Sequence, residues 1–123
     1  MITLDDTQIS RLLDIANAGC HKGCVFEART IYSSVLTLKP GHVPARIGQA
    51  LSHIVVGEYT VAEPMLRDIL SANSDDADAK CMLALCLLFQ KKEEALPLLQ
   101  SLQGREDSAG RLARSLMADL LKL

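Results

Sequence analysis

An internal repeat constrains the fold of this chain more than any other feature. Residues 9–42 align with residues 43–76, and these align with the segment that begins at residue 77, so one repeat period is an offset of 34. With the third repeat one residue shorter in its turn, small and bulky residues fall into register: Ala16, Ala50 and Ala84; Ala28, Ala62 and Ala95; Gly23 and Gly57; Tyr32, Leu66 and Leu99; Val35, Ile69 and Leu102. Such a period indicates supersecondary units that stack, because no single unit can bury its apolar face alone.

Composition decides what the units are made of. The 123 residues are 49% apolar but only 3% aromatic, with no Trp. This apolar fraction is too high for intrinsic disorder, and the apolar runs are much shorter than the roughly 20 residues of a membrane span. Few Val, Thr and aromatic residues argue against a β-sandwich or barrel. We therefore predict one all-α domain over residues 1–123.

The apolar periodicity and the turn residues predict seven helices. They span residues 6–19, 25–38, 43–56, 60–72, 77–90, 93–102 and about 108–122. Pro64 and Pro97 fall at the same repeat position, near the first turn of their helices, where a missing N–H costs little. The last helix is amphipathic and is expected to cap the third repeat.

This pattern resembles the tetratricopeptide repeat (TPR), over residues 9–103. In that motif small residues let two helices approach closely, a Gly supports the turn between them, and a Pro such as Pro40 closes the repeat. The match weakens along the chain, since the third repeat has Lys91-Lys92-Glu93-Glu94 in place of the turn Gly and lacks the closing Pro. The resemblance implies a short right-handed solenoid of three helix-turn-helix repeats (about 9–42, 43–76 and 77–104) with a C-terminal capping helix.

The resemblance also implies a concave groove, lined by the first helix of each repeat, that binds a partner. The implied lining residues are Leu13, Asn17, Ile47, Leu51, Ile54, Val55, Cys81, Leu85, Leu88 and Phe89. A class of these domains binds acidic chain ends through a clamp of Lys, Asn and Arg. Here only Asn17 matches, and Leu13, Gly48, Asp78 and Met82 occupy the other clamp positions. An apolar groove suits an amphipathic helix, and each buried aliphatic side chain contributes roughly 1.5–3 kcal/mol before ordering costs.

Three occupants of the groove are compatible with the sequence. The groove can hold a partner protein, it can be filled by the chain's own last helix or N-terminal residues, or it can be covered by a second copy. The all-apolar stretch over residues 82–89 also fits a fully buried central helix.

The sequence offers little chemistry for catalysis or for a cofactor. Cys20, His21 and Cys24 surround one turn, whereas Cys81 and Cys86 lie about 140° apart on a helix and do not form a second ligand pair. We expect reduced thiols, no metal, no cofactor and no enzymatic activity. A net charge of −2 without a basic stripe also argues against a nucleic-acid partner.

A stand-alone chain with three repeats, an apolar groove and a terminal helix resembles the TPR-fold chaperones of bacterial type III secretion, and its size favours the needle-subunit type. This resemblance implies a cytoplasmic chaperone that binds the amphipathic helix of a secreted needle subunit and keeps it unpolymerised, together with a small helical co-chaperone. The alternatives are a generic TPR interaction module or assembly subunit, and a metal- or redox-linked regulator that uses the Cys and His residues.

Overall fold

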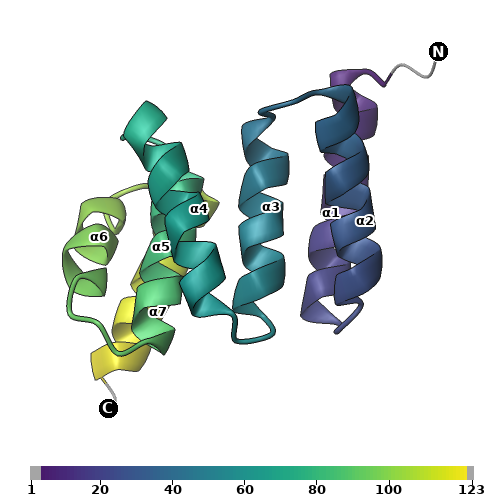
Figure 1. Ribbon diagram of the computed structural model, residues 1–123. Helices are drawn as coiled ribbons and strands as arrows, with labels where there is room; N and C mark the ends of the chain where they lie inside the picture. Colours follow the sequence, from purple (N-terminus) through teal and green to yellow (C-terminus); the bar gives the residue numbers. More distant parts are fainter. Residues whose placement is uncertain (1–3, 122–123) are drawn as a thin grey trace. The chain divides into compact units, whose positions relative to one another are not determined.

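The chain is all-helical, as predicted. The computed structural model describes the backbone of residues 4–121 and the side chains of residues 4–118, and this part holds seven α-helices and no strand (Figure 1). The helices are α1 (Asp6–His21), α2 (Val25–Leu38), α3 (Val43–Ile54), α4 (Tyr59–Ala72), α5 (Ala77–Phe89), α6 (Ala95–Leu102) and α7 (Ser108–Leu121). Among the described residues, none of these helices has both the length and the apolar character needed to cross a membrane.

Local side-chain chemistry explains several helix ends. Asp5 and Gln8 form a capping box at the start of α1, and the Asp76 carboxylate accepts the Ala79 N–H at the start of α5. The predicted starts of α2, α3, α5 and α7 are confirmed. The prediction was wrong for α6, which begins two residues later, because residues 92–94 form a turn in which the Ala95 N–H donates to the Lys92 carbonyl.

Two compact units divide the chain, Met1–Ala62 and Glu63–Leu123. In the first unit α1 packs against α2, and α3 packs against both. Its core contains the small residues of the repeat register, Ala16 and Ala28, around the fully buried ring of Tyr32. At Gly48 in α3 an added Cβ would lie only 2.2 Å from Cε1 of Tyr32. The first unit therefore needs glycine there to let α3 approach α2.

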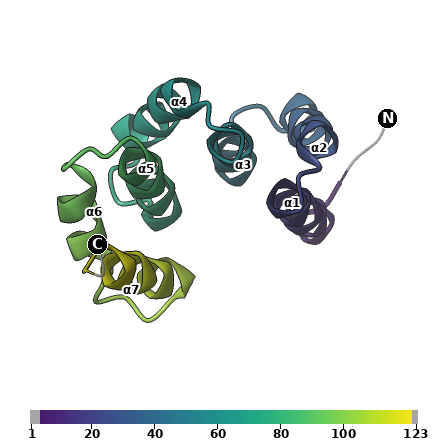
Figure 2. The same cartoon turned by 90° about the horizontal axis from the view of Figure 1, so that it is seen from below.

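The second unit is closed by its last helix. α5 packs against α6, and α7 packs against both, as Figure 2 shows in end view. The cluster between them contains the buried residues Cys81, Ala84, Leu99, Leu102 and Ala113. Leu88, Leu98, Leu116 and Met117 pack at its margin. α7 thus covers an apolar face of α5, as expected of a capping helix.

The turns inside the three helical hairpins share one backbone geometry. Gly23, Gly57 and Lys91 stand one repeat period apart and have φ of 88°, 83° and 60°. In each turn this residue donates its N–H three residues back, to Cys20, Ile54 or Leu88, and the next residue donates five residues back. The third hairpin therefore keeps the left-handed turn although its sequence has Lys in place of Gly. The repeat register extends through all three hairpins.

Candidate functional site

The predicted groove residues of the first unit are mostly covered. Leu13 in α1 and Leu51 and Ile54 in α3 are buried, with 7%, 8% and 2% of their surface exposed. Ile47 is half-buried, and Val55, which caps the end of α3, is exposed. Most of the predicted lining in this unit therefore serves packing in the structure.

The predicted groove residues of the second unit divide in the same way. Cys81 is buried, and its Sγ lies 3.9 Å from the carbonyl oxygen of Ala109 in α7. Leu88 packs at the margin of the cluster that α7 covers, and Leu85 is half-buried. Phe89, the last residue of α5, is 54% exposed. The chain's own last helix thus covers part of the predicted lining here.

The accessible residues occupy one equivalent place in the repeats. His21, Val55 and Phe89 stand one repeat period apart, each at the end of the first helix of its hairpin, and all three are exposed. We call this set the end row. Its second and third members are apolar, so the exposed part of the predicted groove is apolar in both units.

Asn17, the one residue that matched a carboxylate clamp, is engaged inside the first unit. The Tyr32 hydroxyl donates a hydrogen bond to Oδ1 of Asn17, and Sγ of Cys20 lies 3.5 Å from the same hydroxyl oxygen. Burial, together with the neighbouring Cys20 thiol, raises the pKa of the Tyr32 phenol, which therefore stays neutral. Asn17 holds the ring of Tyr32 in place.

An arginine ties α2 to the end of α3 in the first unit. The guanidinium of Arg29 donates to Oγ of Ser52 at 3.0 Å and to the carboxylate of Glu58 at 2.8 Å. Nδ1 of His53 lies 3.1 Å from both the Arg29 guanidinium and the Glu58 carboxylate. His53 and Arg29 together lower the pKa of Glu58. The network holds the turn before α4.

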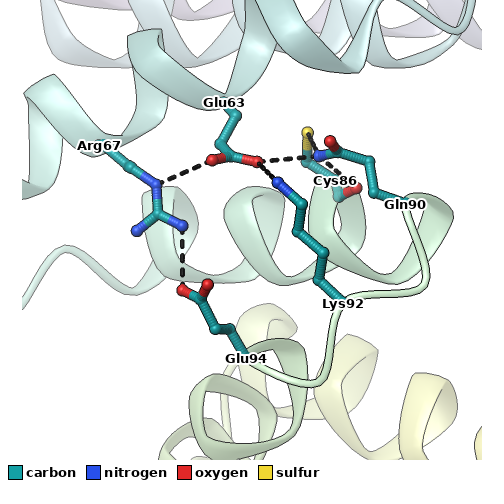
Figure 3. A network of polar contacts seen from close by, with 6 residues as sticks. All are labelled: Glu63, Arg67, Cys86, Gln90, Lys92 and Glu94. Carbon is teal, nitrogen blue, oxygen red and sulfur yellow. Dashed lines mark hydrogen bonds and ion pairs between the residues drawn. The ribbon is translucent and has the colours of Figure 1, made fainter.

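A glutamate organises the corresponding contacts of the second unit (Figure 3). Glu63 in α4 accepts from Nζ of Lys92 at 3.0 Å, Nε2 of Gln90 at 2.9 Å and Nε of Arg67 at 3.1 Å. Hydrogen bonds from Lys92 and Gln90 hold the pKa of Glu63 at about 2 against the opposing effect of burial. Arg67 also donates to Glu94 at 3.1 Å. These contacts fix the turn between α5 and α6.

The thiols are separated in the structure. Cys20 is buried beside Tyr32, while His21, the last residue of α1, and Cys24, in the turn that follows, are exposed. Burial raises the pKa of the Cys81 thiol to about 11 and also raises that of Cys86. Among the residues with described positions, no three His, Cys, Asp or Glu side chains gather in a way that could hold a metal ion.

The two most exposed large apolar side chains of the first unit were missed from the sequence. Phe26 in α2 is 81% exposed and Ile15 in α1 is 62% exposed. Phe26 directly follows the buried Val25, so helical geometry turns it about 100° away from that residue. The signal was therefore present in the helix periodicity. The groove hypothesis considered only the first helix of each repeat, which leaves out Phe26, and only the groove positions on that helix, which leave out Ile15.

The comparison with protein families decides the class of this chain. The model of a family described as bacterial type III secretion protein (HrpB1_HrpK) matches residues 1–122. The chain belongs to the HrpB1_HrpK family. No curated protein and no solved structure matches the chain.

Membership of the HrpB1_HrpK family confirms the predicted association with bacterial type III secretion. The description of the HrpB1_HrpK family states the secretion system without a partner or an activity.

Proposed function

We propose that the chain is a non-enzymatic, protein-binding component of type III secretion. In this proposal it is a TPR-type chaperone that binds the amphipathic helix of a needle subunit and prevents early polymerisation, with a small helical co-chaperone. The observation that carries the proposal is the exposed apolar side chain of Phe89 at the end of α5 in a member of a secretion family, and Val55 is exposed at the equivalent helix end of the first unit. Both side chains lie at the ends of helices that are otherwise well packed, so an apolar partner can contact them without disturbing the fold.

The size of the exposed surface limits the affinity. Val55 and Phe89 are 39% and 54% exposed. Half-buried Leu85 and Leu88 flank Phe89 along its helix, whereas the neighbours of Val55, Leu51 and Ile54, are buried. Covering a few such side chains contributes several kcal/mol before ordering costs, enough for a reversible complex. Reversible binding suits a chaperone, which must release its client for export.

Charge in the end row tests the proposal. We expect Phe89→Asp to weaken binding of the purified needle subunit from the same secretion system at least tenfold, because a carboxylate would have to be desolvated in the complex. Binding is measured by titration calorimetry, and needle polymerisation by light scattering. The matched control is Phe26→Asp, an equally drastic change at an exposed phenylalanine outside the end row.

The outcomes separate the chaperone from an assembly subunit. Unchanged needle binding by a folded Phe89→Asp variant would refute the exposed end of α5 as the binding surface. No needle binding by the unaltered chain, combined with loss of secretion in cells carrying Phe89→Asp, would instead favour an assembly subunit. Cell fractionation gives a second check, since a chaperone that acts before export belongs in the cytoplasm.

A further inference from the structure

Two ion pairs occupy equivalent places in the two units with opposite polarity. Arg29 and Glu63 stand one repeat period apart, in α2 and α4, the second helices of the first two repeats. Glu58 and Lys92 also stand one period apart, in the hairpin turns of the second and third repeats. Nη2 of Arg29 lies 2.8 Å from Oε1 of Glu58, and Nζ of Lys92 lies 3.0 Å from Oε1 of Glu63. The cation is therefore on the helix in the first unit and on the turn in the second.

The surroundings of the two pairs are also equivalent. Arg29 bonds to Ser52, and Glu63 lies in the network that includes Cys86, which stands one repeat period after Ser52. The side chains of Arg29 and Glu63 are only 30% and 18% exposed. Charges that are this well covered are screened less by salt than fully exposed ones, so their signs matter more for packing.

Apolar packing distinguishes one repeat from another only in part. The Tyr32 ring of α2 fits against Gly48 of α3, whose equivalent in α5 is Met82. The small buried positions recur in register, for example Ala28 with Ala62, so they do not by themselves prevent a second helix from docking on the first helix of the wrong repeat. In that misdocked arrangement Arg29 would face Lys92, or Glu63 would face Glu58. Like charges held opposite each other are destabilising.

We propose that the reversed polarity of the pairs Arg29–Glu58 and Glu63–Lys92 fixes the order in which the repeats stack. It rejects assemblies in which a repeat of one copy docks on the wrong repeat of another copy. Each pair joins the second helix of one repeat to the hairpin turn of the next repeat, and we call these contacts the first and second junctions. Charge reversal is confined to them, since the next equivalent positions are Cys24 before the first junction and Leu96 after the second, and neither carries a charge.

Two double variants of the first junction separate a role in stacking order from a role in stability, because the two roles predict opposite rankings of the variants. Arg29→Glu with Glu58→Lys keeps an ion pair but gives the first junction the polarity of the second. Arg29→Gln with Glu58→Gln removes the pair without creating a wrong match. Each protein is unfolded in urea, diluted rapidly at a series of concentrations, and separated by size-exclusion chromatography.

We expect the reversed variant to form about three- to fivefold more oligomer than the unaltered chain, and more than the neutral variant. If the pair only stabilises the fold, the order is the opposite, and the neutral variant forms more oligomer; that result overturns the proposal. Equal oligomer in all three proteins overturns it as well.

A second measurement does not depend on the reversed variant folding. In about 1 M KCl the Debye length falls to about 3 Å, so repulsion between mismatched charges is weakened, although less than it is for fully exposed charges. The unaltered chain should then form more oligomer on refolding than in low salt, by a larger factor than the neutral variant does. The same salt response in both proteins would exclude charge as the source of stacking order.

Discussion

Replacing Lys91 by glycine should stabilise the chain, although it removes an entire side chain. Lys91 has φ of +60°, a left-handed conformation that costs a residue with a Cβ roughly 1–2 kcal/mol relative to the right-handed one. Glycine avoids this cost but gains freedom in the unfolded chain, which offsets roughly 0.4–1 kcal/mol. The net expectation is a gain of about 0.5–1 kcal/mol, or an increase in Tm of about 3 °C for a chain of this size.

Urea denaturation followed by far-UV circular dichroism measures this change, with the midpoint as the readout and an unchanged m-value as the check. Lys91→Ala is the matched control, because it removes the same charge and keeps the Cβ. Gly57→Ala probes the equivalent turn, where φ is +83°, and should destabilise the chain. A Lys91→Gly variant no more stable than Lys91→Ala would refute the assignment of strain to this turn.

Two further predictions concern packing and pH. Gly48→Ala should destabilise the chain by about 1–3 kcal/mol, because the new Cβ would meet the buried Tyr32 ring at 2.2 Å. Gly104→Ala, which would have nothing within 4 Å of its Cβ, is the control. Equal changes in Tm for the two variants would contradict this explanation. The lowered pKa of Glu63, about 2, stabilises the fold above pH 4.5 and the effect is lost as the pH falls toward 2. The unaltered chain loses folding stability between pH 6 and pH 3, and Glu63→Gln should reduce this loss by about 1 kcal/mol, measured from urea midpoints. An unchanged loss in the variant would show that the Glu63 carboxylate is not responsible for the pH dependence.

The repeat register predicted the secondary structure because it reports local and periodic constraints. Glycine at Gly23 and Gly57 marks two turns, and the third could be placed by the repeat period although Lys91 gave no local signal. The start of α6 was misjudged because Glu93 and Glu94 favour a helix start in isolation, whereas Glu94 is bonded to Arg67 from α4. Such a contact between distant residues has no trace in local sequence.

The candidate site was predicted less completely, for a geometric reason. The family positions identify which residues turn toward a groove, but not how closely neighbouring helices cover them. Leu51 and Cys81 are covered in the structure, whereas Val55 and Phe89, at helix ends, are exposed. Helix ends reach past their neighbours, and how far they do so depends on packing distances that a single sequence does not contain.

The position of the tyrosines gives the molecule an uneven optical signal. The chain has no Trp, and its two tyrosines, Tyr32 and Tyr59, both lie in the first unit. Intrinsic fluorescence therefore comes from Tyr32 in the core of that unit and from Tyr59 at the start of α4, which continues into the second unit, while far-UV circular dichroism reports on helices of both. If the two signals change at different urea concentrations, the units unfold separately, and the chain reveals this without any added label.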